Sequence, residues 1–470
     1  MNEECLVTFK TAEGGDERAT ILRLSRYQIA FELYNPQTVL RLSEVLTDFK
    51  ITVRERTIYS GTAVICGMVN AGATLVCEAR LDEAAFLISA FTPDKTRDHA
   101  RAGFNDFLDQ WQKCYQVQPD FKVVMADMQT FLMDLRLWLE QLELEIRSAP
   151  AGDRLEMEDQ TVREIGKHMV PAFDAMHERL EAISEGIEPA FRPVHQNFSK
   201  RQLHQLVLSS PFAYRTYKKP LGYAGDYEMV NMISRDPFEG GSLFAKVLNL
   251  WFLSQWPARA HRNRIAQLKS SLEQEGLRAA RKNSPLRVLN LGCGPAREIQ
   301  SFLSESALSD RAEFTLLDFN DETIQHTSRV LEDIRRQHGR TTRISLVRKS
   351  VQQVLKEGSK PVVQGAGKQY DLIYCAGLFD YLSDKVCKQL MNIFFSQVAP
   401  DGLLLATNVD DCKPFRHMLE FVLDWNLIYR GTEDAAALLP TGVNLEKGGR
   451  ILRDESAVNV FIEARKPGRD

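Results

Sequence analysis

An alternation of strand and helix patterns between residues 285 and 465 constrains the fold of this chain more than any other feature. Short runs rich in Val, Ile and Leu are separated by longer segments whose apolar residues recur at helical spacing. We expect strands at 286–291, 313–317, 343–347, 370–374 and 402–408, and helices at 297–306, 321–337 and 385–398. Parallel strands need crossover helices, so the pattern predicts a doubly wound α/β domain. Residues 426–429 and 459–463 are expected to add an antiparallel edge hairpin.

The chain before this domain divides into an all-β segment and a helical segment. Residues 1–92 contain strand-sized runs at 20–24, 28–33, 49–54, 61–69 and 73–78, which predict a small antiparallel sheet or barrel. Helical spacing begins near Asp94. We therefore expect a multidomain chain with a small all-β domain (1–92), a helical region (93–189), a helical lid or substrate region (190–283) and the α/β domain (284–470).

The helical region contains a long amphipathic helix. The residues Phe104, Phe107, Leu108, Trp111 and Tyr115 fall at helical spacing, and the pattern continues after Pro119 through 120–147. Its apolar stripe predicts either core packing or a homodimer seam. Residues 148–153 are the best linker candidate by composition. Helical patterns resume at 160–184 and, in shorter pieces, at 191–281.

Two motifs at the ends of neighbouring strands indicate a nucleoside site. Gly292 and Gly294 lie in a strand-to-helix turn, where glycine lets the backbone approach a ligand closely. Asp318 ends the next strand, and a carboxylate there can accept hydrogen bonds from both hydroxyls of a ribose. The alternative for Asp318 is a helix cap, although Asn320 or Asp321 can serve that purpose. Together the motifs favour an adenosine-type ligand.

The turn disfavours two common adenosine ligands. Dinucleotide-binding turns usually carry a third glycine, and here that place holds Ala296 after Pro295, which disfavours NAD. A Walker lysine motif is missing, which disfavours phosphoryl transfer from ATP.

Residues 289–296, 316–319 and 370–382 resemble motifs of class I S-adenosylmethionine-dependent methyltransferases. The resemblance covers about 285–465 and implies a Rossmann-like fold with S-adenosylmethionine as cofactor. It implies that Gly292 and Gly294 lie under the methionine part, Asp318 holds the ribose and Phe319 packs beside the adenine. The cofactor-binding residues that it implies are Gly292, Cys293, Gly294, Asp318, Phe319, Cys375, Ala376 and Gly377, the last three facing the sulfonium. Asn290 departs from the family pattern, since many members carry an acidic residue there.

Residues 214–228 are similar to a segment of bacterial proteins in the extracellular-factor-type 3-hydroxypalmitic acid methyl ester biosynthesis family. That resemblance implies methylation of the carboxylate of a 3-hydroxy fatty acid. The residues themselves predict a lid, because Pro220, Gly222 and Gly225 break helices while the tyrosines carry polar tips on apolar bodies. A rigid turn packed between domains is the alternative.

The expected catalytic or substrate-side residues are Tyr223, Asp226, Tyr227, Asp380 and Tyr381. A carboxylate acceptor is ionised at neutral pH and needs no base. An amine or hydroxyl acceptor would need one, with Asp226 or Asp380 as the candidate. The alternative functions are O- or N-methylation of another metabolite or protein, and a non-catalytic protein regulated by S-adenosylmethionine or a cyclic dinucleotide.

Residues 1–92 faintly resemble PilZ-type β-barrels, which sense cyclic dinucleotides. The resemblance rests on the arrangement and on residues 24–28 before a strand. Arg23 and Gln28 replace an expected acid and glycine, and no Arg-x-x-x-Arg motif precedes Ser25. We therefore expect a degenerate barrel that serves contacts or assembly.

Charge and composition limit the partners. The net charge of −4 offers no whole-chain field for nucleic acid, and residues 375–379 lack the Asn-Pro-Pro-aromatic pattern that grips a flipped base. Residues 190–283 hold 15 Lys and Arg against 6 Asp and Glu. This excess suits an anionic small-molecule substrate such as an acyl carboxylate, a phosphopantetheine thioester carrier or anionic lipid, and solvated helix faces are the alternative. The eight cysteines lack metal spacing, so we expect reduced thiols and no metal. Without a secretory signal or a transmembrane segment, the expected location is the cytoplasm.

Overall fold

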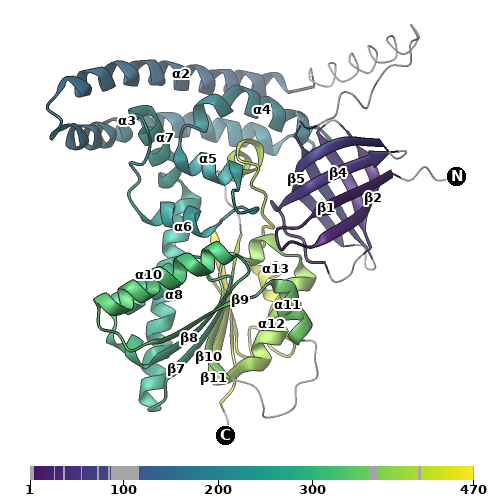
Figure 1. Ribbon diagram of the computed structural model, residues 1–470, viewed down its shortest axis with the longest axis vertical. Helices are drawn as coiled ribbons and strands as arrows, with labels where there is room; N and C mark the ends of the chain where they lie inside the picture. Colours follow the sequence, from purple (N-terminus) through teal and green to yellow (C-terminus); the bar gives the residue numbers. More distant parts are fainter. Residues whose placement is uncertain are drawn as a thin grey trace.

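The structure is a computed structural model that describes residues 5–25, 27–34, 38–53, 56–70, 74–82, 85, 116–358, 369–410 and 414–468. It contains a β-barrel, a helical region and an α/β domain, which meet at a central junction (Figure 1). The three kinds of structure predicted for the chain are confirmed, whereas the boundary between residues 189 and 190 stays a prediction.

The α/β domain contains a seven-stranded sheet in the order β12-β13-β11-β10-β7-β8-β9. The strands are β7 (Leu286–Leu291), β8 (Ala312–Asp318), β9 (Arg343–Arg348), β10 (Tyr370–Cys375), β11 (Val398–Val409), β12 (Gly449–Arg453) and β13 (Asn459–Arg465). Strands β7 to β11 are parallel, whereas β13 is antiparallel to both neighbours. The strand order reverses between β7 and β10, and α/β sheets bind ligands at the carboxyl ends of strands at such a switch point.

Helices cover both faces of this sheet, as double winding requires. One face carries α8 (Trp256–Arg281), α9 (Arg297–Glu305) and α10 (Asp321–Gln337), and the other carries α11 (Val351–Gly358), α12 (Asp384–Gln397) and α13 (Thr432–Ala437). Residues of β10 alternate between the two cores, with Leu372 and Tyr374 in one and Ile373 and Cys375 in the other. Both faces are therefore apolar, which explains the near-continuous apolar strands of the sequence.

The predicted edge hairpin is wrong in one of its strands. β13 contains residues 459–463, but its partner at the edge is β12, and residues 426–429 form no strand. Instead, the backbone N of Ile428 donates to the Asp380 carbonyl at 2.7 Å, and the backbone N of Arg430 donates to the Val409 carbonyl at 2.9 Å. Leu427 and Tyr429 pack against the core of the helical region, so apolar burial there outweighed strand pairing.

The N-terminal part is a closed antiparallel barrel with strand order β1-β2-β3-β6-β5-β4. The strands are β1 (Cys5–Lys10), β2 (Asp16–Leu24), β3 (Gln28–Leu33), β4 (Val45–Val53), β5 (Arg56–Asn70) and β6 (Leu75–Leu81). Strand β1 was not predicted. The rings of Phe9, Phe31 and Phe49 fill the interior, with centroids 5.5 to 6.0 Å apart. The residue Arg26 of the PilZ-like motif lies outside the described residues.

Among the described residues, the helical region starts with a hairpin of two helices, α2 (Pro119–Ser148) and α3 (Arg154–Glu185). The stripe predicted for 120–147 lies in its core, where Phe121, Met128 and Leu139 are fully buried, and the linker predicted at 148–153 forms the turn. The helix expected around Phe104 to Tyr115 lies outside the described residues. None of the described helices has the length and apolar character needed to cross a bilayer.

Shorter helices follow, as predicted for residues 191–281. They are α4 (Arg192–Val207), α5 (Pro211–Lys218), α6 (Tyr227–Ser234) and α7 (Leu243–Ser254), and single turns occur at η3 (Pro189–Phe191), η4 (Ala307–Arg311), η5 (Phe379–Tyr381) and η6 (Met418–Val422). The segment 214–228, predicted to be a loop, is a turn only at residues 219–226, because residues 214–218 belong to α5 and residues 227–228 to α6.

Glu181 of α3 joins the helical region to η6. Its Oε2 accepts hydrogen bonds from the backbone N and the Nδ1 of His417, both at 2.9 Å, and its Oε1 accepts one from the Met418 N at 2.9 Å. Burial raises the pKa of this carboxyl, but the contact with His177 and the hydrogen bonds from His417 outweigh burial and lower the pKa to about 2.

Replacing Glu181 with glutamine is expected to lower the free energy of unfolding by about 3 kcal/mol, because buried donors lose a charged acceptor. The pKa of Glu181 lies below its ordinary value of 4.5, so the stability it contributes is complete above about pH 4.5 and disappears as the pH falls toward 2. Urea unfolding between pH 7 and pH 3 measures both effects. Glu178→Gln, on an exposed position of the same helix, is the control, and equal stability of Glu181→Gln and the native chain at pH 7 would contradict the assignment.

Candidate functional site

Two neighbouring cavities lie at the switch point between β7 and β10. The first has a volume of about 90 Å³ and the second about 110 Å³. Both are lined by Gly225, Gly292, Gly294, Ala376, Gly377 and Tyr381, so one ligand can extend through both. Small-molecule sites commonly measure about 300–1,000 Å³, so a ligand of nucleoside size requires the surrounding segments to move apart.

The turn after β7 presents backbone to the first cavity. Gly294 has a φ of +49°, and no heavy atom lies within 4 Å of the position that a Cβ would take. The backbone N of Gly292 donates to the Leu317 carbonyl at 2.8 Å, which holds the turn against β8. Ala296 has a φ of +51°, a conformation that alanine rarely adopts. Ala296 stands where dinucleotide-binding turns usually carry a third glycine, and its backbone therefore adopts a glycine-like conformation.

Asp318 lies beside this turn and lines the first cavity. Its Oδ2 accepts a hydrogen bond from the Gly294 N at 3.2 Å, and its Oδ1 accepts one from the Asn320 N at 3.1 Å. Burial raises the pKa of the carboxyl, which these hydrogen bonds and Arg41 partly oppose. The cap of α10 is Asn320, whose side chain accepts from the Thr323 N. Asp318 is therefore not the helix cap, and its oxygens retain lone pairs for hydroxyl groups.

Phe319 lines the first cavity and contacts side chains from both other parts of the chain. The ring centroid of Tyr223, in the turn before α6, lies 5.0 Å from that of Phe319. The guanidinium carbon of Arg41, from the barrel, lies 4.3 Å from the same centroid. Burial raises the pKa of Tyr223, so its hydroxyl stays protonated at neutral pH. Arg41 was not among the residues predicted from the sequence.

The end of β10 forms the wall between the cavities. Ala376 and Gly377 line both cavities, Cys293 lines the second only, and Cys375 lines neither, being 1% exposed. A Cβ on Gly377 would lie 2.9 Å from the Nη2 of Arg264, so a larger residue here would displace this guanidinium from its position.

Arg264 of α8 is a second functional candidate that the sequence motifs missed. It lines the second cavity and is 8% exposed, and among the described residues its guanidinium has no hydrogen-bond partner. Its charge acts on two buried carboxyls of the same cavity, Glu298 and Asp380, whose pKa values are raised by burial and lowered in part by Arg264. The second cavity therefore offers both a cation and carboxyl groups.

The predicted lid residues differ in their positions. Tyr223 and Tyr227 line the first cavity, and the Tyr227 hydroxyl donates to Glu322 at 2.8 Å. Burial and this hydrogen bond raise the pKa of Tyr227 to about 12. Asp226 lines neither cavity; its Oδ1 caps α6 by accepting from the Met229 N and pairs with Arg215 at 2.9 Å.

The residues after β10 lie at the cavities. Tyr381 lines both, and its hydroxyl accepts a hydrogen bond from the Trp425 indole at 2.9 Å. Asp380 lines the second cavity, but its Oδ1 accepts from the Val409 N at 2.7 Å. The structure thus places four of the five predicted substrate-side residues at the cavities and holds both aspartates on backbone amides.

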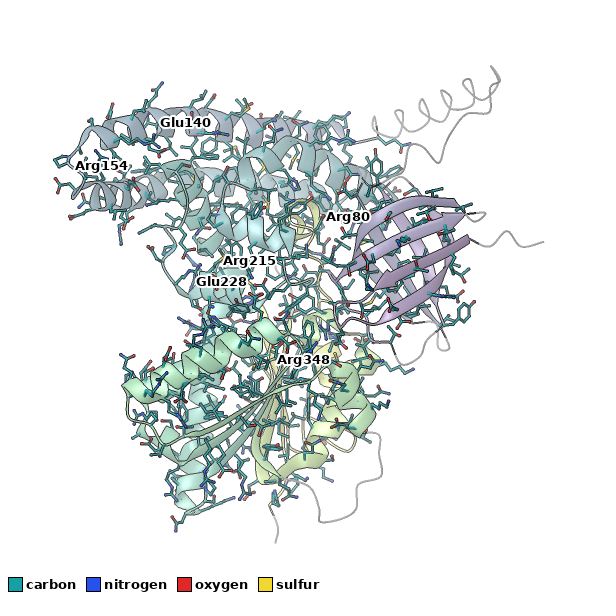
Figure 2. The ribbon with its side chains drawn as sticks, viewed as in Figure 1. Arg80, Glu140, Arg154, Arg215, Glu228 and Arg348 are labelled. Atoms are coloured by element: carbon teal, nitrogen blue, oxygen red, sulfur yellow. The ribbon has the colours of Figure 1, made fainter. Side chains whose placement is uncertain are left out.

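Part of the positive excess of residues 190–283 is used internally. Figure 2 shows Arg215 and Glu228 on the helical side of the junction and Arg348 on the α/β side. Arg215 pairs with Asp226, and Lys246 pairs with Glu158. The cation of this region that faces a cavity without such a pairing is Arg264, within the part of the chain that the structure describes.

Comparisons with known proteins give structural matches of low similarity. No family model and no curated protein matches the chain. A possible exported protein from Bordetella parapertussis is 17% identical, with 65% of this chain and 97% of that chain covered and a TM-score of 0.42. The N-methyltransferase NodS from Bradyrhizobium japonicum is 11% identical, with 43% and 96% covered and a TM-score of 0.28. Magnesium protoporphyrin IX methyltransferase from Synechocystis, with bound SAH, is 10% identical, with 58% and 99% covered and a TM-score of 0.34.

Proposed function

We propose that this chain is an S-adenosylmethionine-dependent methyltransferase that acts on a small molecule. The observation that carries the proposal is the arrangement at the switch point. An open glycine turn and the buried carboxylate of Asp318 lie in one cavity, and the guanidinium of Arg264 lies beside carboxyl groups in the next.

The residues of the two cavities fit the two ends of the donor. In the first, Asp318 would accept hydrogen bonds from the ribose hydroxyls and Phe319 would pack beside the adenine. In the second, Arg264 would hold the carboxylate of the methionine part and Glu298 its ammonium group. A pyrophosphate would instead meet the carboxyl groups of Glu298 and Asp380, so the cavity disfavours a dinucleotide.

When bound, S-adenosylmethionine supplies a methyl group to a nucleophile that lies in line with the carbon–sulfur bond. Ala376 and Gly377, which line both cavities, would let the acceptor approach the donor closely. Positioning of this kind contributes about 7–11 kcal/mol in intramolecular analogues. The turn that carries Tyr223 and the ring of Tyr381 would exclude water from the acceptor.

The acceptor that we propose is a carboxylate, with a 3-hydroxy fatty acid as the best candidate. Apolar side chains of Val230, Ile265, Leu268 and Leu427 line part of the second cavity and suit an acyl chain. An ionised carboxylate needs no base, which agrees with the engagement of Asp226 and Asp380 by backbone amides. We assign substrate contact to Tyr381, which lines both cavities, and a positioning role to the two aspartates. Tyr223 and Tyr227 line the first cavity only and would cover the adenosyl side of the donor.

Incubation with S-adenosylmethionine carrying a radiolabelled methyl group tests this function. Label is expected in the lipid and small-molecule fraction of a bacterial extract, and alkaline hydrolysis should release it as methanol because a methyl ester is cleaved. Tyr381→Phe is expected to lower the incorporation about tenfold, with unchanged affinity for S-adenosylhomocysteine, because the acceptor loses a hydroxyl that the Trp425 indole holds in place. Label confined to protein or RNA would contradict the small-molecule acceptor.

The second candidate is a regulatory protein that binds S-adenosylmethionine without turnover, favoured by the contact of the barrel with the first cavity. Binding of the donor with no label in any fraction would support it.

A homodimer through α2 stays a prediction. Its predicted stripe is buried within the chain, so a dimer would use the exposed Leu137, Trp138 and Leu144 instead.

A further inference from the structure

The barrel reaches the cofactor site through the turn between β3 and β4. Arg41 and Leu42 line the first cavity together with Asp318 and Phe319. Glu44 shapes this turn, since its Oε1 accepts from the Ala12 N at 2.7 Å and its Oε2 accepts from the Arg41 N at 2.9 Å. The first cavity is therefore lined by the barrel, the helical region and the α/β domain.

Arg41 is poised for a ligand. The residue is 4% exposed, its Nη2 donates to Glu13 at 2.5 Å, and its guanidinium lies over the ring of Phe319. Within the described residues its Nε has no hydrogen-bond partner. A buried, unpaired donor is costly, so the ring nitrogens of an adenine are fitting acceptors.

Backbone contacts fix the barrel turn against the site. The Leu42 N donates to the carbonyl of Tyr381 at 3.2 Å, and the Val45 N donates to the carbonyl of Gly222 at 2.8 Å. The barrel thus touches both segments that carry Tyr223 and Tyr381, which line the first cavity.

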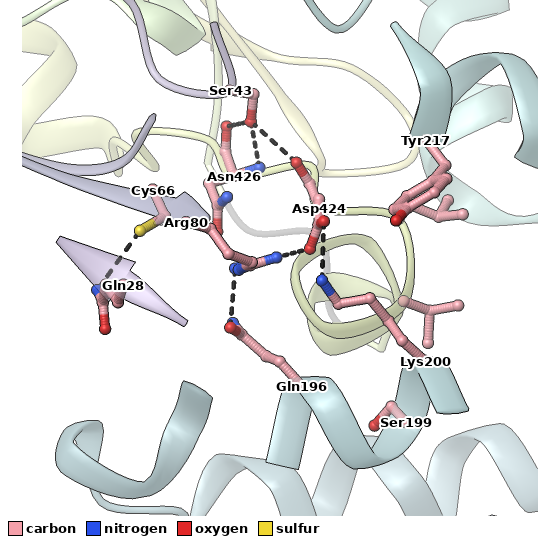
Figure 3. Close-up of polar contacts among 12 residues, drawn as sticks. Gln28, Ser43, Cys66, Arg80, Gln196, Ser199, Lys200, Tyr217, Asp424 and Asn426 are labelled. Carbon is pink, nitrogen blue, oxygen red and sulfur yellow. Dashed lines mark hydrogen bonds and ion pairs between the residues drawn. The ribbon is translucent and has the colours of Figure 1, made fainter. Parts of the chain in front are cut away.

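A buried polar cluster holds the barrel in this position (Figure 3). Asp424 pairs with Arg80 of the barrel and, at 2.9 Å, with Lys200 of α4. The Nη2 of Arg80 also donates to Gln196 at 2.8 Å. Ser43 donates to the Asn426 carbonyl at 3.0 Å and accepts from the Asn426 N at 2.6 Å. Burial lowers the pKa of both Arg80 and Lys200, as expected for cations held inside a protein.

The same segment connects the barrel to the cavities. Trp425, between the two residues that hold the barrel, donates to the Tyr381 hydroxyl. A displacement of the barrel would therefore alter both the wall at Arg41 and the support of Tyr381.

We propose that the barrel is part of the cofactor site, with Arg41 as a binding residue for the adenine of the donor and the cluster around Asp424 as its positioning device. This inference rests on the proposed function, since it takes S-adenosylmethionine as the ligand.

Calorimetric titration with S-adenosylhomocysteine tests the inference. Arg41→Met is expected to weaken binding at least about tenfold, because a charged donor to a buried acceptor is lost. Arg23→Met is the matched control, since Arg23 is an exposed barrel residue paired with Glu78. The affinity of this variant for S-adenosylhomocysteine should stay within twofold of that of the native chain. Equal affinity of Arg41→Met and the native chain would overturn the inference. Absence of binding to the native chain would instead overturn the proposed function.

Hydrogen exchange of the native chain gives a second readout that needs no variant. Binding of S-adenosylhomocysteine is expected to slow exchange at the amides of Leu42 and Val45, which cross the junction, as well as in the turn after β7. Protection of that turn without any change at these two amides would contradict a role for the barrel in the site.

Discussion

Replacing Asp318 with alanine is expected to weaken the binding of S-adenosylhomocysteine at least about hundredfold. Hydrogen bonds to a charged acceptor contribute about 1.5–3 kcal/mol each, and a ribose offers two hydroxyls to this carboxylate. Asp318 is 6% exposed and lines the first cavity. In the variant, water therefore restores the lost hydrogen bonds to the ribose poorly. Isothermal titration calorimetry on the purified variant measures the loss.

Two further variants separate binding from folding. Asp318 also accepts hydrogen bonds from the Gly294 and Asn320 amides, so Asp318→Asn, which keeps one oxygen acceptor, should fold better and lose about tenfold in affinity. Asp321→Asn removes a nearby carboxylate that pairs with Arg348 and lies outside both cavities, and it should bind normally. Native affinity in a folded Asp318→Ala chain would show that this carboxylate does not hold the ribose.

Replacing Arg264 with methionine is expected to weaken the binding of S-adenosylhomocysteine about ten- to hundredfold. The guanidinium faces the second cavity without a hydrogen-bond partner among the described residues. The carboxylate in the amino-acid part of the ligand would therefore be its main partner. Methionine keeps much of the side-chain volume beside Gly377. Arg262→Met is the control, because Arg262 lies two positions away on α8 and donates to backbone carbonyls outside the cavities.

A second ligand tests whether Arg264 binds the carboxylate in the amino-acid part of the donor. 5′-Methylthioadenosine keeps the adenosyl group and lacks the amino-acid part, so its affinity should be the same for Arg264→Met and the native chain. A loss of affinity for both ligands would indicate a general defect of the site and contradict the assignment. Native affinity for S-adenosylhomocysteine, with a raised KM for a carboxylic acid acceptor, would assign Arg264 to the acceptor instead.

Much of the α/β domain could be predicted because its pattern is local. Near-continuous apolar runs such as β10 sit between helices of ordinary length, and the turn at Gly292 and Gly294 has its own signature. The segment 426–429 misled the prediction, because a short apolar run is equally suited to a strand and to packing between domains. Its role depends on contacts with residues far away in sequence.

Arg41 and Arg264 could not be found for the same reason. Each is one of many charged residues in its segment, and its burial follows from how the barrel and α8 dock on the sheet. Arg264 contributes to the excess of Lys and Arg over Asp and Glu in residues 190–283. That excess does not distinguish Arg264 from residues such as Arg215, which pair with carboxylates inside the protein. Asp226, by contrast, precedes an apolar helix in the manner of a helix cap, and the structure uses it in this way.

Calorimetric titration of the native chain with S-adenosylhomocysteine, NAD and ATP tests the central claim most directly. The open turn at Gly294, the carboxylate of Asp318 and the cation of Arg264 predict that S-adenosylhomocysteine binds with one site per chain, and that NAD and ATP produce no binding heat. Binding of NAD or ATP in its place, or no binding of S-adenosylhomocysteine at all, would contradict the account.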